Sequence, residues 1–70
     1  MWQTVKSSNI NRVAYFPDAL LMLLEFKGGS VYAYPQVPKA VYDGLLSAES
    51  KGRYFFKFIK FSFEYMKVTP

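Results

Sequence analysis

Two adjacent glycines, Gly28 and Gly29, constrain the fold of this 70-residue chain more than any other feature of its sequence. They separate residues 20–27 from residues 30–36, and both segments are rich in aliphatic and aromatic side chains. Glycine pairs between such segments are a strong signal for a β-hairpin, because tight hairpin turns need positive φ angles that glycine adopts without strain. We therefore expect two antiparallel strands over these two segments.

A third strand is expected over residues 10–16, immediately before the hairpin. Pro17 and Asp18 follow it as a turn signal, because proline presets φ and aspartate hydrogen-bonds to nearby backbone groups. The last strand of the three is ended by Pro35 and Pro38. The three segments together predict an antiparallel meander.

Two helices are expected after the strands. Pro38 suits the first turn of a helix over residues 38–49, where its missing N–H costs nothing. Gly52 follows and is suited to a left-handed helix cap. Residues 53–60 make sense as a second helix, because the helical period separates rings from cations. One face of it would carry Tyr54, Phe55, Phe58 and Ile59, and the other Arg53, Phe56, Lys57 and Lys60.

The expected fold class is α+β: a three-stranded antiparallel β-meander followed by two short helices (β-β-β-α-α), in one domain spanning residues 1–70. From Phe61 the apolar period changes to two, with Phe63 and Tyr65 on the same side. This alternation predicts a final extended segment or C-terminal edge strand.

The absence of cysteine and histidine limits both the stability and the chemistry of the chain. No disulfide can form, and no zinc site is expected, because zinc prefers thiolate and imidazole ligands. The usual general base and thiol nucleophile are missing, and the five carboxylates are scattered along the sequence. We therefore expect a non-catalytic protein with no metal and no cofactor, whose core depends on its 20% of aromatic residues.

The net charge of +4 is concentrated at one end of the sequence. Residues 1–50 are balanced, whereas residues 51–70 hold five cations, one carboxylate and half of the aromatic side chains. Such an asymmetry favours an anionic partner, although a modest charge offset is also common in small soluble proteins.

A nucleic-acid site, most simply for RNA, is one function that this pattern supports. Arg53, Lys57 and Lys60 are spaced i, i+4 and i+7, and Lys51 precedes them, so they form a basic stripe for phosphates. Tyr32 and Tyr34 point the same way from a strand and are suited to stack on bases. The alternatives are a merely solvated helix face for the cations and a core position for both tyrosines.

A protein interface is the second function that the sequence leaves open. Leu21, Leu23 and Phe56 are apolar at positions expected to face solvent, and a continuous apolar patch would bind a protein partner or a second copy of the chain. The alternative is that a second layer covers them, for instance Trp2 and Val5, or the aromatic residues of the C-terminal tail. No membrane association is expected, because the longest apolar run, residues 19–24, is too short to span a bilayer; a cytoplasmic location follows by default.

Motifs along nearly the whole chain resemble a known family. They are Ser7-Ser8-Asn9-Ile10, Leu23 to Phe26 with Gly29, Val31-Tyr32-Ala33-Tyr34, Val37-Pro38, Val41-Tyr42, Ala48-Glu49-Ser50-Lys51-Gly52, Tyr54-Phe55 and Ile59-Lys60. The chain thereby resembles the KTSC domain, a module found at the C-terminus of some lysyl-tRNA synthetases and alone in small bacterial and phage proteins. The resemblance implies no enzyme activity and raises the case for RNA binding. Phe56 departs from it, since the family usually has a polar residue at that position.

Overall fold

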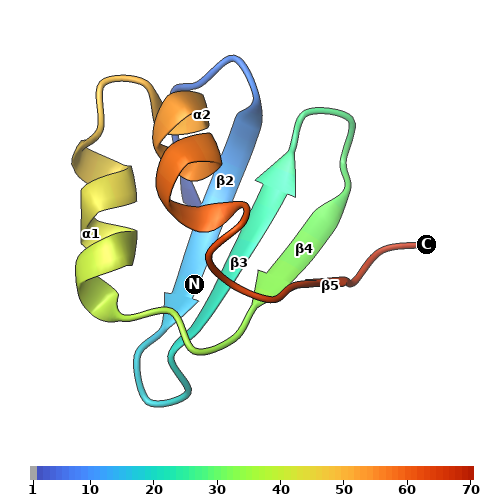
Figure 1. The fold of residues 1–70 in the computed structure, drawn as a ribbon. Coiled ribbons are helices and arrows are strands. Elements are labelled where there is room, and N and C mark those ends of the chain that lie inside the picture. The colour runs from blue at the N-terminus through green and yellow to red at the C-terminus, as the bar shows by residue number, and fades with distance from the viewer. Residues whose placement is uncertain (1) are drawn as a thin grey trace.

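The computed structural model describes residues 2–70 as a five-stranded antiparallel sheet with helices on one face (Figure 1). The strands are β1 (Trp2–Thr4), β2 (Ile10–Phe16), β3 (Leu21–Phe26), β4 (Val31–Tyr34) and β5 (Met66–Lys67), and they lie in the sheet in chain order. The helices are α1 (Lys39–Ser47), α2 (Lys51–Tyr54) and η1 (Phe55–Ile59), a π-helix that continues α2.

The α+β class, the central meander and the helical segments match the sequence prediction, but the prediction understates the sheet. It lacks β1, which pairs antiparallel with β2, and it starts the final strand too early. After η1 the chain is still turning, because the N–H groups of Ser62 and Phe63 donate to the carbonyl of Ile59. Residues 61–65 therefore cannot form a strand, and only Met66 and Lys67 pair with β4.

The hairpin turn between β3 and β4 has the predicted geometry. Gly28 and Gly29 have φ angles of 99° and 98°, which other residues rarely adopt. The prediction for Gly52 was wrong, because this residue lies inside α2 and is not among the residues with positive φ. A Cβ atom at Gly52 would meet the side-chain oxygen of Asn9 at 2.8 Å. The glycine therefore allows the side chain of Asn9 to lie close to the backbone of α2.

The register of the strands decides which face of the sheet the helices cover. Leu24 lies opposite Val13 and Tyr32, so these three side chains share a face. Met22 and Tyr34 are paired on that same face. It packs against the helices in one core, whose buried members are Ile10, Val13, Met22, Leu24, Tyr34, Val37, Leu45 and Ile59.

Close contacts hold α1 on the sheet and the two helices against each other. The hydroxyl of Tyr15 in β2 donates to the carbonyl of Val37 at 2.6 Å, and its ring stacks on Tyr42 of α1 with the ring centroids 4.8 Å apart. The ring of Tyr54 lies directly against Gly44, where any Cβ atom would overlap it. Gly44 therefore lets α1 and α2 pack together, although glycine weakens a helix by about 1 kcal/mol relative to alanine.

None of the helices within residues 2–70 has the length and apolar character needed to cross a bilayer.

Candidate nucleic-acid interface

Residues 53–60 are helical, as their pattern of rings and cations predicts. Ile59 is fully buried, whereas Arg53, Lys57 and Lys60 are exposed, so the cations lie outside and the helix packs inward. Phe58 differs from the prediction, because its side chain is 46% exposed.

The second half of this segment is wound more widely than an α-helix. The N–H of Lys60 donates to the carbonyl of Phe55 at 2.8 Å, which is the i→i+5 bond of a π-helix. Residues four apart are neighbours on a helix surface, so Lys60 lies on the same side as Phe56. The ammonium group of Lys60 accordingly lies 5.3 Å from the centroid of the Phe56 ring.

An open groove of about 590 Å³ lies between this helical segment and the β3–β4 hairpin. Its aromatic lining comprises Phe26, Tyr32, Tyr34, Phe55, Phe56 and Tyr65, and its polar lining comprises Asn9, Lys27, Ser30 and Lys60. This volume is within the range of about 300–1,000 Å³ that small-molecule sites occupy. The groove thus combines aromatic rings with two cations, Lys27 and Lys60.

The two strand tyrosines differ in accessibility. Tyr34 is 3% exposed and belongs to the floor of the groove. Its burial, reinforced by neighbouring Tyr32 and Tyr65, raises the pKa of its hydroxyl to about 12. Tyr34 is therefore a core residue and cannot stack on a base. Tyr32 is half-buried, and Tyr65 lies beside it with the ring centroids 5.6 Å apart.

The cations of the basic stripe line two hollows that share part of their lining. A shallower hollow lined by Arg53 and Lys57 shares Asn9, Gly52 and Phe56 with the groove. The structure therefore brings Arg53 and Lys57 close to the groove that Lys60 lines.

Lys51 differs from the other cations of the segment. Its ammonium group donates to the carbonyl of Ala48 at 3.0 Å, and the residue is half-buried. It stabilises the link between α1 and α2 and adds positive potential rather than a free contact.

The lining residues that sequence reasoning missed include Asn9, Lys27 and Tyr65. The loop before β2 is fixed by the Ser7 hydroxyl, which accepts from the N–H of Asn9 at 3.2 Å. The carbonyl of Asn9 accepts from the N–H of Lys27 at 2.8 Å, which ties this loop to the end of the hairpin. The Ser7-Ser8-Asn9 motif could have indicated Asn9, whereas Lys27 and Tyr65 reach the groove only through tertiary packing.

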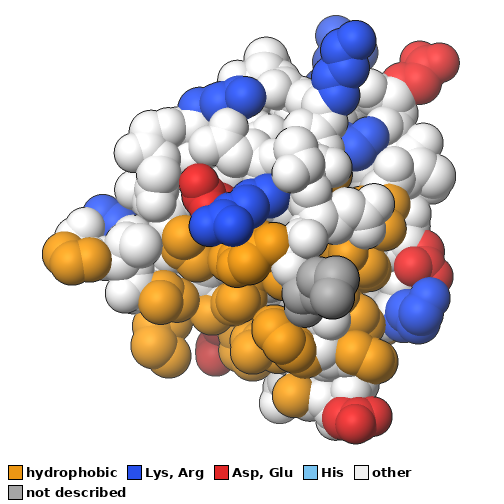
Figure 2. Space-filling model, turned by 180° about the vertical axis from the view of Figure 1, so that it is seen from behind, with side chains coloured by type: hydrophobic (Ala, Val, Ile, Leu, Met, Phe, Trp, Pro, Cys, Tyr) orange, Lys and Arg blue, Asp and Glu red, His pale blue; other side chains and the backbone are white. Residues whose placement is uncertain are grey.

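The three residues of the alternative protein interface do not share one surface. Leu21 and Leu23 alternate along β3 with Met22 and Leu24, whose side chains pack under the helices. Leu21 and Leu23 therefore lie on the opposite face of the sheet, where they are paired with Phe16 and Ala14. Phe56 lies in the groove on the helical side and is 59% exposed. The sheet face opposite the helices is called the open face below, and it is mainly apolar (Figure 2).

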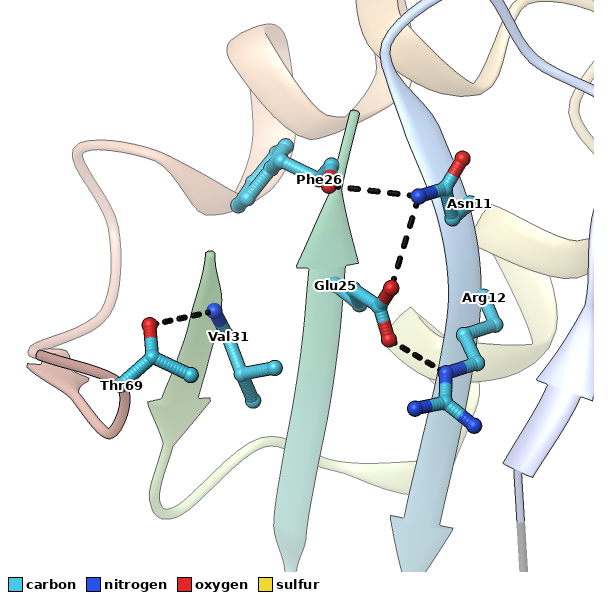
Figure 3. A network of polar contacts seen from close by, with 6 residues as sticks. All are labelled: Asn11, Arg12, Glu25, Phe26, Val31 and Thr69. Carbon is cyan, nitrogen blue, oxygen red and sulfur yellow. Dashed lines mark hydrogen bonds and ion pairs between the residues drawn. The ribbon is translucent and has the colours of Figure 1, made fainter. Parts of the chain in front are cut away.

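A small polar network crosses the open face at β2 and β3 (Figure 3). The guanidinium of Arg12 forms an ion pair with Glu25, whose other carboxylate oxygen accepts from the side-chain amide of Asn11 at 3.4 Å. The hydrogen bond from Arg12 holds the pKa of the Glu25 carboxyl below its usual range. At the sheet edge, the N–H of Val31 donates to the hydroxyl of Thr69 at 3.1 Å.

No cluster of three acidic or metal-ligating side chains occurs in the described part of the chain, residues 2–70.

The meander, with two short helices on one face and a groove beside them, defines a small α+β domain of a distinct type. The chain belongs to the KTSC domain family, whose sequence profile matches residues 6–63. The crystal structure of a KTSC domain protein from Yersinia pestis superposes with a TM-score of 0.92 at 36% identity, covering 99% of this chain and 97% of that chain.

Two kinds of relative carry this domain. A lysine–tRNA ligase of a Nostoc species is 42% identical over 64 residues, a match that covers 91% of this chain. The chain spans only 11% of the length of that ligase. A protein of Tsukamurella paurometabola is 46% identical over 52 residues, which make up 74% of this chain and 78% of that protein.

Proposed function

We propose that this KTSC domain is a non-catalytic module that binds single-stranded RNA along the groove between the helical segment 51–60 and the β3–β4 hairpin. The observation that carries the proposal is the juxtaposition, in the groove and the hollow beside it, of exposed rings and cations that form no ion pair within residues 2–70. The similarity to a lysine–tRNA ligase supports an RNA partner, since that relative bears a name that includes tRNA. The proposal includes a cytoplasmic location.

The cations supply the sequence-independent part of the binding. Arg53, Lys57 and Lys60 do not form ion pairs with carboxylates in residues 2–70, so each is available for a phosphate. Exposed cation–π contacts of the kind that Lys60 makes with Phe56 are worth about 0.5–1 kcal/mol, so a phosphate competes for the ammonium group easily.

The rings supply the stacking part. Tyr65 is 60% exposed and Phe56 is 59% exposed, and they lie at the groove together with half-buried Tyr32. Stacking between a base and such a ring contributes about 1–3 kcal/mol and accepts any base. Only an unpaired strand can present its bases to the groove, which is why single-stranded RNA fits better than a duplex.

The test is a salt titration of the affinity for a fluorescently labelled, unstructured oligouridine. Three phosphate contacts on a single strand predict that log K falls with log salt with a slope of about −2. The variant Arg53→Ala/Lys57→Ala/Lys60→Ala is expected to lose most of the affinity and nearly all of the slope. An unchanged affinity in this variant would refute the proposal.

Single substitutions distinguish RNA binding at the groove from binding that depends only on the overall charge of the protein. Lys60→Ala removes a cation from the groove, whereas Lys39→Ala removes one from the start of α1, where it pairs with Asp43 at 2.8 Å. Tyr65→Ala is expected to cost about 1–3 kcal/mol of binding free energy. Phe16→Ala, which removes a ring from the open face, should leave binding unchanged. Equal losses within either pair would show that no site exists at the groove.

A further inference from the structure

The open face carries one row of side chains that crosses all five strands of the sheet. The members of the row are consecutive partners in the strand pairing: Trp2, Ala14, Leu23, Ala33 and Met66. Large and small side chains alternate along it. The side chain at its centre, Leu23, comes from the central strand β3.

This alternation is the pattern that a second sheet requires. Stacked sheets pack about 10 Å apart, with large side chains of one layer fitting over small ones of the other. Neighbouring strands are about 4.8 Å apart. A shift by one strand therefore places Leu23 of one sheet over Ala33 of an identical sheet, because Ala33 is partly accessible whereas Ala14 is 1% exposed and already covered within its own chain.

The electrostatics of the open face suit a copy of itself. At its paired strand positions within residues 2–70, the charged side chains are Arg12 and Glu25, and they neutralise each other. The guanidinium of Arg12 also lies 4.3 Å from the centroid of the Trp2 ring. The exposed cations of the helical segment lie on the other side of the sheet. Two open faces can therefore meet without bringing the net positive charge of the two chains together.

The apolar surface continues to the border of the face. Phe16 is 40% exposed, Met66 67% and Val68 58%. Figure 2 shows apolar side chains gathered over the middle and lower part of this view, with few charged groups among them. Contiguous apolar patches on soluble proteins usually mark an interface.

We propose that two copies of this chain associate through their open faces to form a two-layer β-sandwich, with Leu23 at the centre of the interface. The expected partner is a second copy of the chain. The open face has no net charge at its paired positions, and its large and small side chains alternate, so it is complementary to an identical face. The two RNA grooves then point outward, away from each other. The association does not depend on RNA binding.

Sedimentation equilibrium of the 70-residue chain tests this proposal. We expect a mass of twice 8.1 kDa at micromolar concentration. Leu23→Glu would bury a carboxylate in the interface and should lower the mass to that of one chain while the far-UV circular dichroism remains that of the folded protein. Phe56→Glu, which places the same charge on an exposed residue of the other layer, should leave the mass doubled.

Either of two results would overturn the proposal: a single-chain mass for the unmodified protein, or a doubled mass that persists in folded Leu23→Glu. Salt gives an independent readout, because a neutral apolar interface should hold in high salt whereas RNA binding weakens. A dimer that dissociates in high salt contradicts an interface of this kind.

A chemical cross-linking test decides the matter if Leu23→Glu fails to fold. Because the chain lacks cysteine, one introduced thiol is unique. Sheets stacked about 10 Å apart hold two such thiols too far apart for a disulfide, so a short thiol-reactive bifunctional reagent is used. It should cross-link a large part of Ala33→Cys, since the proposed interface places position 33 over Leu23 of the second copy and so one strand spacing from the second position 33. Phe56→Cys should cross-link little. Equal yields at the two positions would exclude the open face as the interface.

Discussion

The covered and open faces of the sheet are built from the same strands but carry different chemistry. On the covered face, Met22 and Leu24 are fully buried under the helices, and the border of that layer holds the cations and exposed rings. On the open face, Leu21 and Leu23 come from the same strand and remain partly accessible. Alternate residues of β3 thus belong to two surfaces, one that stabilises the fold and one that is free for a partner.

The comparison shows how a chain of 70 residues can have two separate surfaces without a second domain. Because side chains alternate across a strand, one short sheet presents an apolar neutral face and a basic aromatic border. A substitution on one face therefore leaves the other largely intact, which makes the two roles separable by experiment.

The largest expected difference between the faces is in how much a truncated side chain lowers the free energy of unfolding. Leu24→Ala leaves a cavity in the core and should lower the free energy of unfolding by about 2–5 kcal/mol. Leu23→Ala, one residue away on the open face, should cost less than about 1.5 kcal/mol when the chain is dilute enough to be monomeric. Urea unfolding followed by circular dichroism measures both. Equal losses would mean that the open face is covered in the isolated chain.

Gly44→Ala tests how closely the helices must approach each other on the covered face. The added methyl group overlaps the ring of Tyr54, and overpacking of this kind costs about 1–3 kcal/mol. Gly52→Ala is the matched control, because its methyl group meets only the end of the exposed Asn9 side chain. We expect thermal unfolding to show a clear loss for Gly44→Ala and a smaller one for Gly52→Ala. A stabilised Gly44→Ala would contradict the packing described for α1 and α2.

Alkaline pH should lower the free energy of unfolding through Tyr34, which lies on the covered face. Burial raises the pKa of this hydroxyl to about 12, so the folded protein keeps it protonated after the unfolded chain has lost the proton. Unfolding then releases a proton above about pH 10, and stability falls as the pH rises from about 10 to about 12. Urea unfolding across this range should show a steeper loss for the natural chain than for Tyr34→Phe. Parallel pH profiles would show that Tyr34 ionises normally.

The smallest expected effect belongs to the open face and its ion pair. The lowered pKa of Glu25 means that its contribution to stability is present at neutral pH and disappears as the pH falls through the folded pKa of the carboxyl. Arg12→Ala should therefore destabilise the protein slightly at neutral pH, and the part of this loss that is due to the ion pair should vanish once Glu25 is protonated. Unfolding curves at neutral and acidic pH measure this difference. A constant difference between the two proteins would assign the effect to lost packing on Trp2 instead.

The sequence predicts a helix, strand or turn well where the signal for it comes from residues within that segment. The Gly28–Gly29 turn, the strands that flank it and the helical segment 53–60 all follow from spacing and backbone preference. The three-residue strand β1 is too short to show a period, and it exists because β2 provides a partner for it. The final strand was placed too early because the aromatic alternation after Ile59 looks like a strand and is in fact a turn.

The candidate site was harder to predict than the fold, because its residues come together only through strand pairing and the packing of helices on the sheet. Sequence alone does not decide whether Tyr34 or Ala33 faces the helices, since both are apolar enough for a core, and the strand register settles it. The basic residues could be found from their helical spacing. The position of Lys60 beside Phe56 follows from the same spacing, because residues four apart are neighbours on a helix surface.

The brevity of the outermost strands has a consequence for how this protein can aggregate. β1 has three residues and β5 has two, so the sheet offers few free backbone groups on which another chain could extend it sideways. Growth into ribbons or fibrils would require such lateral addition, whereas contact between flat faces closes on itself after two molecules. Concentrated solutions of the protein are therefore expected to contain discrete particles of one size rather than polymers.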